Sequence, residues 1–234
     1  MPANINSTNQ PKAWYKKWWG LIIVFFLSLI FIIITALIFY FFNILKAYRQ
    51  INSDNSQLVN QLLASEIYEA EGKNSFWAGS ASPKVTIVEF ADFNCPLCGN
   101  AYSKIREISL KYKKDVKIVY RDFPVYENSV DLSLAARCAG EQGAFWLMHD
   151  KLFQNQGNFK IEQLPELAKQ IGVDEKKFNS CLSEEKYLND IKNDFTEAES
   201  LGVTGTPTWF INGRKLPGDI PYQLLIQIID GLLE

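Results

Sequence analysis

The sequence is poor in histidine and cysteine, and its first 49 residues contain no acidic side chain. One His and four Cys are spread over 234 residues, and Cys138, Cys181 and His149 lack the paired spacing that the second half of a zinc site requires. Residues 1–49 contain five basic residues, so the other 185, with 19 basic and 26 acidic residues, have a net charge of −7. An acidic body argues against a nucleic-acid-binding protein. A content of 47% hydrophobic and 14% aromatic residues argues against full disorder.

Residues 20–42 also lack any charged side chain. As a helix this segment would reach about 34 Å, enough for a hydrocarbon core of about 30 Å. Lysines and interfacial aromatics precede it, namely Lys12, Trp14, Tyr15, Lys16, Lys17, Trp18 and Trp19. These features predict a cytoplasmic tail (1–19), a transmembrane helix (20–42) and an extracytoplasmic remainder. A cleaved signal peptide is the rival interpretation, but the apolar run is long for one and no small-x-small cleavage site follows it.

The remainder of the chain divides into a stalk and a domain. Residues 43–83 are rich in Asn, Gln, Ser and Ala and predict a stalk or linker. Residues 84–91 predict a strand, 95–112 a helix that Asp92 or Asn94 caps, and 115–120 a second strand. Residues 129–202 have helical periodicity, including one long helix over 184–200. Strands at 206–211 and 214–216, joined by Asn212-Gly213, and a helix over 221–233 follow.

A Cys-x-x-Cys motif lies at the first strand-to-helix junction of this domain. Cys95 would occupy the positive end of the helix, where the dipole and free backbone N–H groups lower a thiol pKa. Cys98, one turn further, would be less exposed. This pattern predicts Cys95 as the attacking thiol and Cys98 as the resolving thiol. A static disulfide and half of a zinc site are the alternatives; a bridge this short stabilises a fold little, and no second ligand pair is present.

Two segments together resemble the DsbA-like thiol:disulfide oxidoreductases. They are the run from Val88 to Cys98 (VEFADFNCPLC) and the run from Gly205 to Gly213 (GTPTWFING), separated by a large helical insert. The resemblance covers about residues 83–234. It implies an α/β thioredoxin fold over residues 84–234 with a helical domain inserted at about 127–202, preceded here by the one transmembrane helix.

The resemblance also implies roles for individual residues. Cys95 and Cys98 match the redox pair, and Pro207 matches a cis-proline that leaves the backbone before it, at Thr206, free to pair with an extended substrate. Glu89 matches a buried acid that exchanges a proton with Cys98.

The dipeptide between the cysteines, Pro96-Leu97, departs from the His-containing pair of the strongly oxidising members. We therefore expect the Cys95 thiolate to depend on the helix end alone.

The two remaining cysteines lie on predicted helices of the insert. In an oxidising compartment they predict a structural disulfide between Cys138 and Cys181, with two buried free thiols as the alternative. His149 lies in the same insert, where we expect it to serve packing or the surface rather than catalysis.

The sequence therefore predicts a membrane-anchored oxidoreductase that introduces disulfides into exported cysteine-containing proteins. Its catalytic domain would lie outside the inner or plasma membrane, or in the periplasm, and a quinone-linked membrane partner would reoxidise it. No metal or other cofactor is expected. A reductase or isomerase of the same compartment, and a tethered metal-binding or chaperone module, are the alternatives.

Overall fold

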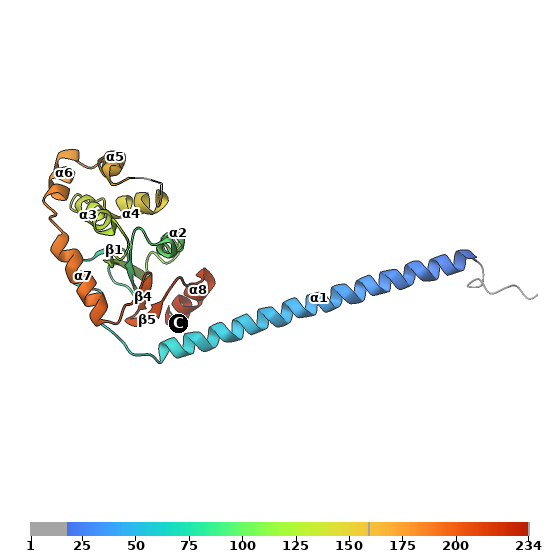
Figure 1. Ribbon diagram of the computed structural model, residues 1–234. Coiled ribbons are helices and arrows are strands. Elements are labelled where there is room, and N and C mark those ends of the chain that lie inside the picture. Colours follow the sequence, from blue (N-terminus) through green and yellow to red (C-terminus); the bar gives the residue numbers. More distant parts are fainter. Residues whose placement is uncertain (1–17, 159, 234) are drawn as a thin grey trace, which may run out of the picture. The chain divides into compact units, whose positions relative to one another are not determined.

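Figure 1 shows the computed structural model, which describes residues 18–158 and 160–233. The chain divides into two compact units, with the boundary after Ser56. Among the described residues, the first unit is entirely helical. The second contains a mixed α/β domain.

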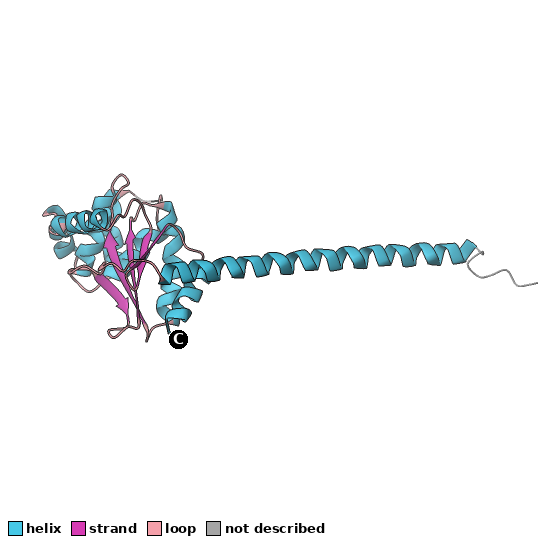
Figure 2. Ribbon diagram, turned by 90° about the horizontal axis from the view of Figure 1, so that it is seen from below, coloured by secondary structure: helices cyan, strands magenta, loops and turns pink. Residues whose placement is uncertain are grey.

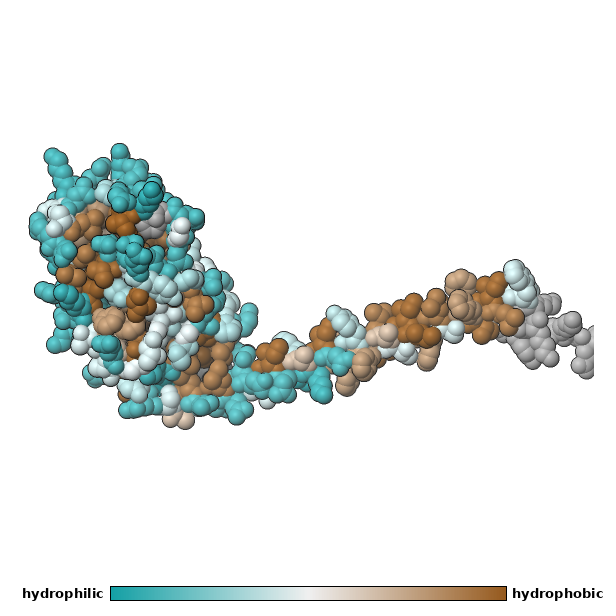
Figure 3. Space-filling model, viewed as in Figure 1, coloured by the Kyte–Doolittle hydropathy of each residue, from teal (hydrophilic) through white to brown (hydrophobic). Residues whose placement is uncertain are grey.

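Helix α1 (Trp18–Leu63) contains the predicted membrane span. None of its most apolar 18-residue stretch is buried within the protein, and Figure 3 shows apolar side chains along this part of the helix. The hydroxyls of Ser28 and Thr35 donate to the backbone oxygens of Phe25 and Ile32, both at 2.8 Å. Each hydroxyl therefore has a hydrogen-bond acceptor within the helix and does not need water. The helix is long and apolar enough to cross a membrane. The expected lysines and aromatics of the tail before Trp18 lie outside the described residues.

Five strands form one mixed sheet in the order β1-β3-β2-β4-β5. Their bounds are β1 Phe76–Gly79, β2 Val85–Ala91, β3 Val116–Asp122, β4 Thr208–Ile211 and β5 Arg214–Pro217. Strands β2 and β3 are parallel, and the other neighbours are antiparallel. The predicted order of strand, helix, strand, helical block, hairpin and final helix is confirmed. Strand β2 is central and buried on both faces, which explains its β-branched sequence.

Helices cover both faces of this sheet (Figure 2). On one face, α2 (Pro96–Lys111) and α8 (Tyr222–Leu233) pack with alternate strand residues such as Ile87 and Trp209. On the other, Phe90 and Phe210 pack with α7 (Leu188–Ser200). Strand alternation places Glu89 on the same face as Ile87, toward α2.

The segment predicted as a stalk (43–83) differs from that prediction. Residues 43–63 continue α1. Leu62 is buried in the core beside α8, and strand β1 pairs with β3. The α/β domain therefore begins well before residue 84. The sequence concealed this because β1 is a four-residue edge strand, whose partner lies about 40 residues further along the chain.

The predicted helical insert consists of α-helices and one short 3₁₀ helix. They are α3 Ser129–Gly140, α4 Phe145–Gln154, the 3₁₀ turn η2 Ile161–Gln163, α5 Leu164–Gln170, α6 Glu175–Ser183 and α7. The long helix expected over 184–200 begins only at Leu188, because Glu185 adopts a left-handed conformation (φ 47°) after α6 ends. A disulfide between Cys138 and Cys181 joins α3 to α6.

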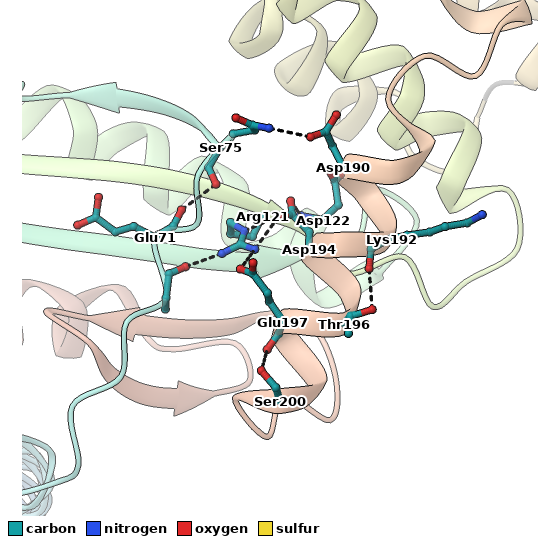
Figure 4. Close-up of polar contacts among 12 residues, drawn as sticks. Glu71, Ser75, Arg121, Asp122, Asp190, Lys192, Asp194, Thr196, Glu197 and Ser200 are labelled. Atoms are coloured by element: carbon teal, nitrogen blue, oxygen red, sulfur yellow. Dashed lines mark hydrogen bonds and ion pairs between the residues drawn. The ribbon is translucent and has the colours of Figure 1, made fainter.

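A network of buried ion pairs joins α7 to strand β3 of the sheet (Figure 4). Asp194 on α7 receives hydrogen bonds from Arg121 on β3, at 2.7 Å, and from Arg137 on α3. Arg137 also donates to Asp122 at 2.6 Å. All four side chains are at most 9% exposed. Burying a single charge is costly, so each of these charges depends on its oppositely charged partners.

Candidate active site

The two motif cysteines lie where β2 passes into α2. Cys95 is the N-cap residue of α2, and Pro96 fills the first helical position, where a missing N–H costs nothing. Neither Asp92 nor Asn94 caps the helix, contrary to the sequence-based expectation. Both cysteines are free thiols, and both residues are nearly fully buried, at 1% and 0% exposed. The expected difference in exposure is therefore absent.

Electrostatics, rather than exposure, distinguishes the two thiols. Hydrogen bonds from the Cys98 thiol, from Thr206 and from the backbone N–H groups of Leu97 and Cys98 lower the pKa of Cys95 to about 5. Burial, the hydrogen bond with Cys95 and the charge of Glu89 raise the pKa of Cys98. At neutral pH Cys95 is a thiolate and Cys98 a thiol, which is the protonation state that a nucleophilic Cys95 would require.

The loop before β4 meets Cys95 from the opposite side. The peptide bond between Thr206 and Pro207 is cis. In its protonated form, Cys95 donates to the backbone oxygen of Thr206, with the sulfur 3.3 Å from that oxygen. The structure thus brings together the redox pair and the predicted Thr206-Pro207 segment, which are more than 100 residues apart in the sequence.

Glu89 lies beneath this pair on β2, between Tyr120 of β3 and Trp209 of β4 in the strand register. It is 2% exposed, and its Oε1 has no hydrogen-bond partner in the described part of the chain. Burial, followed by the negative charges of Asp219 and Cys95, raises the pKa of Glu89 to about 8. A carboxyl that is protonated at neutral pH beside Cys98 is suited to proton exchange with it.

This raised pKa predicts how the stability of the reduced protein varies with pH. Between about pH 4.5 and 8 the unfolded chain releases the Glu89 proton and the folded chain keeps it, so this contribution to stability falls as pH rises, then levels off. Glu89→Gln should abolish the decline and raise the free energy of unfolding at pH 8.5 by a few kcal/mol, an order-of-magnitude value.

The free energy of unfolding of the wild type and of Glu89→Gln is measured with urea at pH 5 and at pH 8.5. Cys95 is present in both proteins, so its own contribution to the pH dependence cancels when the two are compared. Glu107→Gln, at an exposed position of α2, is the control and should leave the pH dependence unchanged. Equal pH dependence in wild type and Glu89→Gln would contradict the assignment.

Asp92 is a site residue that the sequence did not reveal in its actual role. Its buried carboxylate accepts hydrogen bonds from the backbone N–H groups of Asn94, at 2.7 Å, and of Val125 and Tyr126, at 2.7 and 2.9 Å, and from the Ser129 hydroxyl. It therefore fixes the 125–129 loop beside the redox loop. The signal was a carboxylate directly after a buried strand, but its partners in the 125–129 loop lie more than 30 residues further along the chain.

This loop brings Tyr126 to the redox cysteine. The negative charge of Cys95 and a side-chain hydrogen bond with it raise the pKa of Tyr126. The Cys95 pKa is lowered by the Cys98 thiol and by Thr206 in addition to the helix end, which corrects the expectation that the helix end acts alone. Leu97 between the cysteines is 48% exposed.

The helical insert also contacts the redox loop. Gln156, after α4, donates to the backbone oxygens of Phe93 and Cys95 at 2.8 and 2.9 Å. A side chain at Gly99 would lie 2.3 Å from the Gln156 Oε1, so glycine permits this approach.

The other predicted residues of the insert have structural partners. Cys138 and Cys181 are bonded to each other within the insert. His149 is fully buried among aromatic rings, including those of Phe93, Tyr120 and Trp146. In the described ranges, no group of three or more His, Cys, Asp or Glu side chains is placed to hold a metal ion.

Comparison with known proteins identifies the domain. A family model described as thioredoxin matches residues 71–231. Curated relatives include the Na(+)/H(+) antiporter NhaA 3 of Salinispora tropica, 37% identical over 149 residues that cover 62% of this chain and 22% of that protein. Another is NhaA 1 of Mycobacterium sp. strain KMS, 29% identical, covering 65% and 26%. The chain spans only about a quarter of the length of these antiporters.

Solved structures share the fold along most of their own length. The Pseudomonas aeruginosa DsbA2 structure is 29% identical with a TM-score of 0.57, covering 69% of this chain and 96% of that one. A thioredoxin-like oxidoreductase from Silicibacter pomeroyi is 26% identical with a TM-score of 0.63, covering 68% and 92%. Bacillus subtilis BdbD, 22% identical with a TM-score of 0.65 and coverage of 72% and 99%, shares the fold. The match of the family model from residue 71 agrees with a domain that includes β1.

Proposed function

The chain belongs to the thioredoxin family, and from this premise we propose that it is a thiol:disulfide oxidoreductase that oxidises cysteine pairs of exported proteins. The observation that carries this proposal is the environment of Cys95. A thiolate that is stabilised by several hydrogen bonds stabilises the reduced form of the enzyme. A stable reduced form makes the disulfide form a strong oxidant.

The reaction starts from the disulfide between Cys95 and Cys98. A substrate thiolate attacks the Cys95 sulfur, the enzyme disulfide breaks, and Cys98 leaves as a thiolate that takes the Glu89 proton. A second substrate thiolate then attacks the substrate sulfur of the mixed disulfide and releases Cys95 as its stabilised thiolate. The substrate loses two electrons and gains a disulfide, and the enzyme pair is reduced.

The groups around the sulfurs then have distinct roles. The backbone at Thr206, before Pro207, lies against Cys95 and pairs with the substrate segment. Pro96 begins the helix, and exposed Leu97 offers an apolar contact to the substrate.

The expected location is outside the cytoplasm, with α1 as a single membrane anchor and the N-terminus on the cytoplasmic side. Support comes from the apolar helix and from the disulfide between Cys138 and Cys181, a bond that oxidising compartments favour. A membrane redox partner, linked to quinone, would accept the electrons of reduced Cys95 and Cys98.

The redox potential of the full-length protein, equilibrated with a glutathione series in detergent, tests the direction of the reaction. Because of the lowered pKa of Cys95, we expect a potential at least several tens of mV above the value of about −270 mV typical of thioredoxin. A value at or below that of thioredoxin would instead indicate a reductase. Mass spectrometry of the native protein tests the alternative metal-binding module, which requires bound metal.

A further inference from the structure

A glutamine of the helical insert is bonded to the redox loop. The Gln156 side-chain nitrogen donates to the backbone oxygens of Phe93 and Cys95, at 2.8 and 2.9 Å. A primary amide has two N–H groups, so each oxygen receives its own hydrogen. The Cys95 oxygen also accepts the Gly99 N–H at 3.1 Å, the first bond of helix α2. Gln156 thus contacts the chain on both sides of Asn94, where the loop passes into the helix.

Aromatic packing places this glutamine. Gln156 follows α4, and its backbone N–H donates to the Phe153 oxygen at 3.2 Å. The Phe153 ring packs against Phe93 of the redox loop, with ring centroids 5.1 Å apart, and stacks on Tyr102 of α2, with centroids 5.4 Å apart. These ring contacts hold the end of α4 against both the loop and α2, so little chain entropy is lost when the amide forms its bonds.

The missing side chain at Gly99 makes room for the amide. A Cβ at this position would lie 2.3 Å from the Gln156 Oε1 and 3.1 Å from its Cδ. Both atoms belong to the far end of a flexible side chain, so an added methyl group would displace the glutamine rather than the backbone. Alanine is also favoured over glycine inside a helix. Gly99→Ala should therefore remove the contact without weakening the helix.

The position of the Cys95 backbone determines what its sulfur can reach. Cys95 is the N-cap residue of α2, with φ −75° and ψ 120°. The backbone N–H groups of Leu97 and Cys98 bond to its sulfur and help to lower its pKa. The free N–H groups of a first helical turn point along the helix axis, so these bonds depend on the geometry of the cap. A group that holds the Cys95 carbonyl therefore also holds the sulfur at the helix end.

We propose that Gln156 is a positioning residue of the redox site, through which the helical insert holds the Cys95 sulfur over the first turn of α2. This inference rests on the proposed function. Without the two hydrogen bonds of the amide, the segment from Phe93 to Cys95 gains freedom and the sulfur loses part of its contact with the N–H groups. The reduced form then loses stability relative to the disulfide form, and the enzyme becomes a weaker oxidant.

The test uses the full-length protein in detergent. Gln156→Met keeps the length of the side chain and removes both donors, whereas Gly99→Ala keeps the glutamine and displaces it. The matched controls are Gln154→Met, at an exposed position of α4, and Gly231→Ala on α8, where an added Cβ would meet no described atom within 4 Å.

Two quantities are measured for wild type and each variant. The first is the pH midpoint of Cys95 alkylation by iodoacetamide in the reduced protein, with the modified residue located by mass spectrometry. The second is the equilibrium constant of the cysteine pair with glutathione at pH 7. Urea unfolding gives the stability of each protein.

We expect both test variants to raise the pH midpoint of Cys95 alkylation by about half a unit to one unit. At pH 7 Cys95 stays largely ionised, so this shift makes the reduced form about three to ten times less favoured in the glutathione equilibrium. The stability of Gly99→Ala should not fall below that of wild type. A merely structural role would lower stability and leave the midpoint and the equilibrium constant unchanged.

Midpoints and equilibrium constants equal to those of the controls would overturn the proposal. If Gln156→Met does not fold, Gly99→Ala decides alone, because it retains the glutamine. If the wild-type cysteine pair does not exchange with glutathione, the proposed function fails. If wild type does exchange and the test variants match the controls, only the positioning role of Gln156 fails.

Discussion

Cys95→Ala should abolish the oxidation of reduced ribonuclease by the full-length protein, to the level of the uncatalysed control. Cys95 is the thiol whose pKa is lowered to about 5, while the pKa of Cys98 is raised. In Cys95→Ala the remaining thiol is therefore protonated at neutral pH and does not exchange. The measurement is the rate at which ribonuclease activity is recovered.

Cys98→Ala should differ from Cys95→Ala in a second measurement. It cannot form the internal disulfide, so it too fails as an oxidase. Cys95 should still react with iodoacetamide at neutral pH, more slowly than in the wild type, because the hydrogen bond from Cys98 that lowers its pKa is lost. Cys98→Ala should also accumulate a stable mixed disulfide, because the resolving thiol is gone. Ser103→Ala, at an exposed position of the same helix, is the control and should retain full activity. Equal iodoacetamide reactivity in the two cysteine variants would refute the assigned roles.

Asp194→Ala should lower the free energy of unfolding by about 3–5 kcal/mol, because it leaves two buried guanidinium groups with Asp122 as the one buried carboxylate of the network. Both Arg121 and Arg137 bond to the Asp194 carboxylate, and both are 2% exposed. Urea unfolding of the full-length protein measures the loss. We expect α7 to detach first, since this network fastens it to β3 and α3.

Glu197→Gln is the matched control on the same helix. Glu197 pairs with the same Arg121, at 2.6 Å, but its side chain is 54% exposed. Solvent screens such a pair, so the loss should stay within about 1 kcal/mol. Equal losses in the two variants would show that burial of the network does not determine its contribution.

The elements that could be predicted are those with local signals. The βαβ unit, the helical insert and the Asn212-Gly213 hairpin follow from periodicity and turn residues near one another in the chain. The burial of Glu89 follows from strand alternation, since its neighbours on one face are Val85 and Ile87. Strand β1 could not be predicted, because a short edge strand is specified by its partner β3 rather than by its own sequence.

The amino-acid sequence by itself determined the apolar helix and the Cys-x-x-Cys motif at the start of a helix. Each of these features depends on residues that are adjacent or regularly spaced. Only the tertiary structure decided what surrounds the sulfurs. It brought Thr206 and Tyr126 to Cys95, and it bonded Asp92 to the 125–129 loop rather than to the helix end. It also placed the charge of Asp219 where it raises the pKa of Glu89. These contacts join residues 30 to 130 positions apart, and burial, which shifts the pKa values, exists only once the chain has folded.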